Sequence, residues 1–176
     1  MIDHEVNALP VDLQRIARQA NIRILRNADI QVLQPCESGL SLYDGQQWFV
    51  VFDETDSRQR RRFTVAHEFG HIFLGHALRE DNRFARTFVK DKPVYETEAD
   101  IFASRLLAPA CVLWALNLHT AEEISDVCNI SITAAQIRAQ RMEVLYARNK
   151  FLTHPLERQV LENFEQFVRD YKSKKG

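Results

Sequence analysis

The sequence has few cysteines and no long apolar run. Its three cysteines, Cys36, Cys111 and Cys128, are odd in number, widely spaced and outside any C-x-x-C pattern. This usage favours free thiols in a reducing compartment over a disulfide framework. No apolar stretch approaches the roughly 20 residues that span a bilayer, and residues 1–5 lack the basic and apolar regions of a signal peptide. We therefore expect a cytoplasmic protein without a membrane partner.

A strong excess of charge of either sign is also absent. The formal net charge is −1, so no global field demands nucleic acid or an anionic membrane. Hydrophobic residues make up 45% of the chain and charged residues 27%, which is ordinary for a soluble protein with a core. No internal repeat or low-complexity linker interrupts the 176 residues. We expect a core over residues 1–118 and a helical C-terminal segment over 119–176, in the same domain or as an appendage.

The stretch His67-Glu68-Phe69-Gly70-His71 has the pattern H-E-x-x-H. Residues four apart share one face of a helix, so both imidazoles can reach one metal ion. Glu68 follows the first histidine closely enough to face the same site and act as a general base. Neutral imidazole suits zinc, and a catalytic zinc keeps one position open for water. Because chance produces the pattern in roughly one or two such chains per hundred, the zinc prediction depends on its context.

That context is an apolar helix preceded by short strands. Asp56 with Gln59 could cap the helix start, and Gly75 lies where a terminating glycine should be. The strands predicted before the helix are residues 22–25, 30–33, 39–43 and 47–52, the last two flanking the hairpin signal Asp44-Gly45. We therefore expect an α+β fold, in which a small, mostly antiparallel sheet and the H-E-x-x-H helix pack among several helices. In zinc peptidases, a strand beside the site can bind substrate backbone along its edge.

A second acidic element supplies candidates for a third metal ligand. Residues 95–109 form a helical pattern that Pro109 ends. Glu98 shares a face with Ile101, Phe102 and Leu106, so we expect its carboxylate to point towards the core, where zinc would offset the cost of burial. Asp100 lies on an adjacent face that suits a group orienting a ligand histidine through its second ring nitrogen. Glu96 is the alternative ligand, because its spacing to Asp100 resembles another zinc-peptidase arrangement; we favour Glu98.

His76 is a weaker candidate ligand. The third histidine of the metzincin pattern would lie at Ala77 and its glycine at Leu74, so that pattern is absent. On a continuous helix, His76 is also rotated well away from the face that carries His67 and His71.

Two further segments contain several basic residues. Residues 77–92 mix arginine, lysine and phenylalanine, and we read them as a loop over the mouth of the cleft. Residues 120–148 have the pattern of a helix-turn-helix whose second helix bears Arg138, Arg141 and Arg148. The same pattern often only packs, so we do not expect direct contact with nucleic acid.

Taken together, two motifs resemble those of one family. Residues 62–76 are similar to the signature of the ImmA/IrrE-like metallopeptidases, and residues 98–109 are similar to that family's second motif, which begins Glu-Ala-Asn or Glu-Ala-Asp. The order of elements resembles the family over residues 8–148. The resemblance implies a zincin-like core with Zn2+ held by His67, His71 and Glu98, and with Glu68 as the catalytic base. Asp100 departs from the common asparagine, and Ala108 from the usual methionine.

The resemblance also implies a biological role. Members are intracellular endopeptidases, often encoded on phages or mobile elements, and cleave helix-turn-helix repressors to release transcription; others act in stress responses. The alternative is a non-proteolytic regulatory binding protein with a structural zinc site or a DNA-binding helical segment. An intact Glu68 favours the peptidase, since a structural site has no use for a base there.

Overall fold

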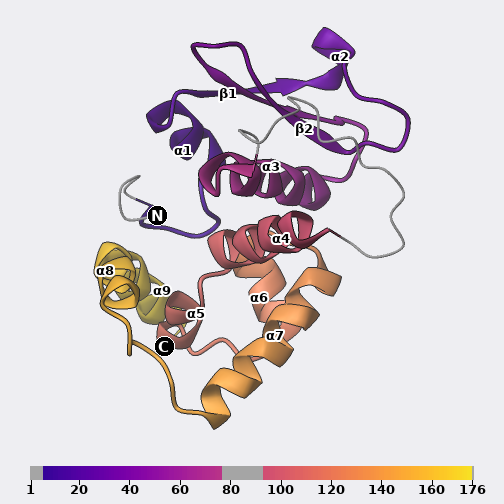
Figure 1. Ribbon diagram of the computed structural model, residues 1–176. Coiled ribbons are helices and arrows are strands. Elements are labelled where there is room, and N and C mark those ends of the chain that lie inside the picture. Colours follow the sequence, from indigo (N-terminus) through magenta and orange to yellow (C-terminus); the bar gives the residue numbers. More distant parts are fainter. Residues whose placement is uncertain (1–5, 77–92, 176) are drawn as a thin grey trace. The chain divides into compact units, whose positions relative to one another are not determined.

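The computed structural model describes residues 6–76 and 93–175 of the chain, which form two compact units. One unit runs from Leu13 to Ala103, and the other joins the residues up to Asp12 with those from Ser104 onward. The predicted boundary at residue 118 stays a prediction. The elements of the first unit, shown in Figure 1, are α1 (Leu13–Gln19), β1 (Ile22–Arg26), α2 (Asn27–Ile30), β2 (Gly39–Tyr43), β3 (Trp48–Phe52), α3 (Arg58–Phe73) and most of α4 (Val94–Leu107).

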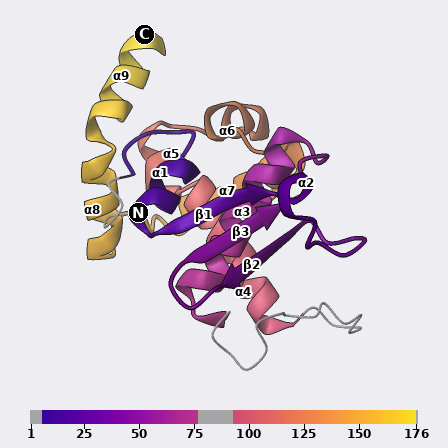
Figure 2. The same cartoon turned by 90° about the horizontal axis from the view of Figure 1, so that it is seen from above.

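Within the described ranges the sheet has three strands in the order β1-β3-β2 (Figure 2), with β1 parallel and β2 antiparallel to β3. The α+β class and the small sheet beside the H-E-x-x-H helix are confirmed. The predicted strand at residues 30–33 is wrong, because Asn27–Ile30 forms α2 instead. The side-chain oxygen of Asn27 accepts hydrogen bonds from the backbone N–H groups of Val32 and Leu33, each at 3.0 Å, and so takes two donors that a strand would use.

The hairpin at Asp44-Gly45 forms, but its loop is longer than the two residues expected. Tyr43 pairs with Trp48, which leaves residues 44–47 in the loop, and Gly45 alone among them has a positive φ, of 96°. The Asp44 carboxylate accepts hydrogen bonds from the backbone N–H groups of Gln46 and Gln47, at 2.9 and 2.7 Å. These bonds hold the pKa of Asp44 below its ordinary value.

The metal-motif helix α3 is buried on both sides. Its residues 64–71 are all buried, because the sheet covers one face and α4 the other (Figure 1). Ser57, and not the predicted Asp56, caps the helix start by accepting a hydrogen bond from the Arg60 N–H at 3.3 Å. At the other end Gly75 has φ 75°, which fits the predicted terminating glycine.

The second unit is helical in the part of the chain that the structure describes. Its further helices are α5 (Ala110–Ala115), α6 (Ala121–Cys128), α7 (Ile132–Ala147), α8 (Pro155–Asn163) and α9 (Glu165–Lys175). Thr120 and Glu123 form the capping box of α6, and Ser131 caps α7, so the helix-turn-helix-like pair is present. Cys111 and Cys128 are buried and Cys36 is exposed, all three as free thiols. Across the described ranges, no helix combines the length and apolarity that crossing a bilayer requires.

Candidate metal centre

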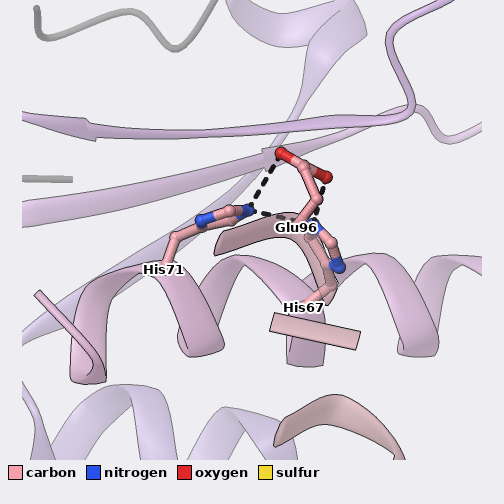
Figure 3. Close-up of side chains that lie close together, drawn as sticks. All are labelled: His67, His71 and Glu96. Carbon is pink, nitrogen blue, oxygen red and sulfur yellow. Dashed lines mark hydrogen bonds and ion pairs between the residues drawn. The ribbon is translucent and has the colours of Figure 1, made fainter. Parts of the chain in front are cut away.

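His67 and His71 point from neighbouring turns of α3 towards one point (Figure 3). Their Nε2 atoms lie 3.0 Å apart, and the two residues are 6% and 4% exposed. Glu96, in the first turn of α4, extends its carboxylate between them. Glu96 Oε2 is 3.3 Å from His67 Nε2, and Glu96 Oε1 is 3.5 Å from His71 Nε2. Two imidazoles and a carboxylate therefore meet at one buried place.

These three groups fit a metal ion by their chemistry and their spacing. Asp100 Oδ1 lies 2.8 Å from His67 Nδ1, and since an ionised carboxylate only accepts, His67 carries a proton on Nδ1. With a metal bound, the neutral ring would turn the lone pair of Nε2 towards the cluster. Metal–nitrogen bonds of about 2.0–2.1 Å at tetrahedral angles place two ligand atoms about 3.3 Å apart. The spacings of 3.0 to 3.5 Å here lie close to that value. Two histidines with one glutamate are a donor set of catalytic zinc.

The charges in the cluster call for a cation at its centre. Burial alone would lower the pKa of His67, but hydrogen bonds with Asp100 and Glu96, together with the negative charge of Glu68, raise it to about 9. Burial opposes ionisation of Glu96 as well, yet the two histidines hold the pKa of its carboxyl well below the ordinary range. Without a metal, the proton on His67 balances the charge of the neighbouring carboxylates. A divalent ion would neutralise the same carboxylates.

Glu98, the third ligand favoured from the sequence, lies outside this cluster, whereas the alternative Glu96 lies in it. Its side chain is 53% exposed, and its Oε2 is 3.1 Å from Nε2 of His76. The expected burial of the Glu98 carboxylate is wrong, because Ile101, chosen to mark the buried face, is 44% exposed, whereas Ala99 and Ala103 are fully buried. The face of α4 that packs inward therefore carries small residues.

Close packing of α3 and α4 explains those small residues. A Cβ added at Gly70 would lie 3.0 Å from Ala99 Cα and 3.2 Å from its carbonyl oxygen. The two backbones therefore touch at Gly70, and this contact sets Glu96 above the histidines. The sequence did hold a signal for Glu96, the spacing Glu-x-x-x-Asp. This spacing places Glu96 about one helical turn from Asp100, the carboxylate expected to orient a ligand histidine. Asp100 lies against His67 as that reasoning expects; its role towards a metal ligand stays a prediction.

Glu68 faces an open cleft beside the cluster. The cleft is lined by Glu37, Gly39, Leu40, Ser41, Glu68, His71 and Glu96. Glu68 is 3% exposed, and its Oε1 would lie 3.3 Å from a Cβ at Gly39, which would also clash with Thr64 Cγ2. Glycine at position 39 thus lets β2 pass directly over α3 and Glu68. Sequence reasoning did not identify Glu37 or Ser41, since the course of β2 over α3 is a tertiary feature.

The other histidines of the described chain lie elsewhere. His76 is buried, and its Nδ1 lies 3.2 Å from Nδ1 of His71, on the side of that ring away from the cluster. His119 is exposed and contacts Asn117, while His154 caps α8. The segment 77–92, predicted to be a loop over the cleft, lies outside the described residues.

Comparison with known proteins identifies the family of the chain. A search among curated proteins finds no match. The family model described as the IrrE N-terminal-like domain, Peptidase M78, matches residues 17–140, more than two thirds of the chain, and this range contains α3, α4 and the whole candidate site. The match supports a metallopeptidase function with a protein substrate. The chain therefore belongs to the Peptidase M78 family of IrrE N-terminal-like domains.

Proposed function

We propose that the chain is a zinc-dependent endopeptidase whose metal is held by His67, His71 and Glu96. The observation that carries this proposal is the convergence of three buried ligand groups beside Glu68, in one cleft. Zinc suits this mixed nitrogen and oxygen donor set. A structural zinc site is typically closed by four protein ligands, whereas in the described residues the cluster holds three, as catalytic sites do.

Glu68 is the proposed general base. Bound zinc would polarise the scissile carbonyl and lower the pKa of a bound water to about 7. Glu68 takes a proton from the attacking water while the water oxygen bonds to the carbonyl carbon. Glu68 then passes that proton to the amide nitrogen as the C–N bond breaks. The carboxylate faces the cleft that His71 and Glu96 also line, so it lies on the side where a substrate would enter.

Substrate backbone would bind along β2. Among the described strands β2 is at the sheet edge, with β3 on its other side, so its outward N–H and C=O groups can pair with an extended peptide. Gly39, Leu40 and Ser41 belong to β2 and line the cleft, which would bring the bound peptide past Glu68. An extended segment is thus the form of substrate that this edge accepts.

We further propose that the substrate is a cytoplasmic helix-turn-helix transcriptional repressor, cut once to release transcription. The family resemblance supports this assignment. The alternative is DNA binding through the helix-turn-helix-like pair. Of the three arginines that the sequence places on its second helix, Arg138 is only 7% exposed and donates from Nε to the Ala108 carbonyl at 2.7 Å, so it is not available for such a contact. Burial lowers the pKa of Arg138 to about 10, as expected for a guanidinium used in packing.

Co-expression with a repressor encoded beside this chain tests the proposal. We expect intact-mass analysis to show one defined cut with the wild type and with Glu143→Gln, an exposed change on α7. Glu68→Gln should keep zinc but leave the repressor whole, because an amide cannot accept the proton. Derepression with uncut repressor, equal for the wild type and Glu68→Gln, would overturn the peptidase assignment in favour of regulation by binding.

A further inference from the structure

His76 is a buried polar residue that the proposed mechanism does not use. It is 3% exposed, and both of its ring nitrogens have partners. Nδ1 lies 3.2 Å from His71 Nδ1, and Nε2 lies 3.1 Å from Glu98 Oε2. His76 therefore lies between the Nδ1 edge of His71, which faces away from the cluster, and the Glu98 carboxylate, which is half exposed to solvent.

The turn after α3 brings His76 back to the site. The helix ends at Phe73, and the Gly75 N–H donates to the Ile72 carbonyl at 3.1 Å. Gly75 has φ 75°, a left-handed conformation that glycine adopts without strain, and this reverses the chain. On a continuous helix His76 would point away from His71; the turn at Gly75 removes that restriction.

The proton positions in this chain follow from the metal site. If His71 offers the lone pair of Nε2 to zinc, its neutral ring carries the proton on Nδ1. That N–H can then donate to His76 Nδ1, which must be the unprotonated nitrogen of its own ring. The His76 proton is consequently on Nε2 and is donated to Glu98, which as a carboxylate only accepts. Each bond fixes the tautomer required by the next.

We propose that His76 is a positioning residue for His71, and that Glu98–His76–His71 is a relay that orients the ring and strengthens it as a metal ligand. The relay is the counterpart of the direct Asp100–His67 contact at 2.8 Å. Each proposed histidine ligand is thereby hydrogen-bonded towards a carboxylate: His67 directly to Asp100, and His71 through the imidazole of His76 to Glu98. The inference rests on the proposed metal site, since the tautomer argument starts from zinc on His71 Nε2.

Zinc affinity of the full-length protein, measured by competition with a chelator, tests the relay. His76→Phe keeps a ring in the pocket but no hydrogen-bonding nitrogen, and should weaken zinc binding about 10- to 100-fold. His76→Asn can place an oxygen near the former Nδ1 and should recover most of that loss. His119→Phe, an exposed histidine in the other compact unit, should bind zinc like the wild type.

Nitrogen-15 NMR of the zinc-loaded protein gives a readout that a purely structural role would not move. We expect His71 protonated on Nδ1 and His76 on Nε2 in the wild type, with the His71 Nδ1–H resonance shifted in His76→Asn. Unchanged affinity in His76→Phe, or a wild-type His76 protonated on Nδ1, would overturn the relay alone. Equal, complete loss of zinc in both His76 variants at saturating zinc would make His76 a ligand or a folding residue. A wild type that binds no zinc would instead defeat the proposed metal site.

Discussion

The carboxylate of Glu96 defines the site at the scale of single residues. It is 13% exposed and lies within 3.5 Å of two imidazole nitrogens. Burying an ionised carboxylate is costly unless it is paired or binds a metal. A group that a protein keeps ionised at such a place has a charged partner, and here two histidines and a metal ion can share that role.

Exchanging the two glutamates of α4 separates their roles. Glu96→Gln should cost zinc affinity more than the 10- to 100-fold typical of an outer hydrogen-bond partner, because it replaces a charged ligand. Glu98→Gln should cost far less, since an amide oxygen can still accept from His76. Metal content after dialysis, measured by atomic emission, distinguishes them. Zinc retained by Glu96→Gln and lost by Glu98→Gln would restore the ligand choice made from the sequence.

Site residues could be predicted from the sequence where their placement depends on neighbours in the chain, and not where it depends on tertiary packing. His67 and His71 lie four residues apart on one helix, so their spacing alone predicts that they share a face, with Glu68 close beside them. The choice between Glu96 and Glu98 depended on which face of α4 is buried. Large apolar residues suggested the face of Ile101, but the packed face carries Ala99 and Ala103, which contribute little to any hydrophobic pattern.

At the scale of elements, the approach of α4 to α3 holds the candidate ligands together. The helices meet at Gly70 and Ala99, where an added Cβ would lie only 3.0 Å from Ala99 Cα. Small residues at such a contact let two backbones approach closely, and rigid helices then carry that spacing to Glu96. The register of His-Glu-x-Gly-His thus includes a packing residue between its two histidines.

Gly70→Ala should destabilise the protein although alanine favours helix by about 1 kcal/mol. Its Cβ would meet backbone at 3.0 Å, and overpacking of this kind typically costs about 1–3 kcal/mol. We expect a lower urea midpoint and weaker zinc binding, because α4 must move. Arg58→Ala, on the exposed first turn of α3, is the control and should change stability by less than about 0.5 kcal/mol. A Gly70→Ala protein as stable as the wild type would contradict this account of the contact.

Turn signals were easier to predict than short strands. The hairpin at Asp44-Gly45 and the terminating Gly75 depend on neighbours in sequence, and both formed. The expected strand at residues 30–33 did not, since Asn27 binds its backbone donors.

At the scale of the whole molecule, the candidate metal site belongs to a single compact unit. Every cluster residue lies between Leu13 and Ala103, the two histidines on α3 and Glu96 on α4. A ligand that binds only the folded form stabilises it by mass action. Zinc should therefore stabilise the Leu13–Ala103 unit directly, since it links α3 to α4 through side chains of both.

Metal removal should lower the thermal midpoint measured by scanning calorimetry. Free zinc at 100 times its dissociation constant stabilises the folded form by about 2.7 kcal/mol, which corresponds to about 5–11 °C for a chain of this size. EDTA should abolish that increment in the wild type. Glu96→Gln should melt near the EDTA-treated wild type and respond little to chelator, because it has lost the binding that EDTA removes. An equal fall in both proteins would place the chelator's effect outside the cluster, and no fall in either would mean that the fold does not depend on the metal at all.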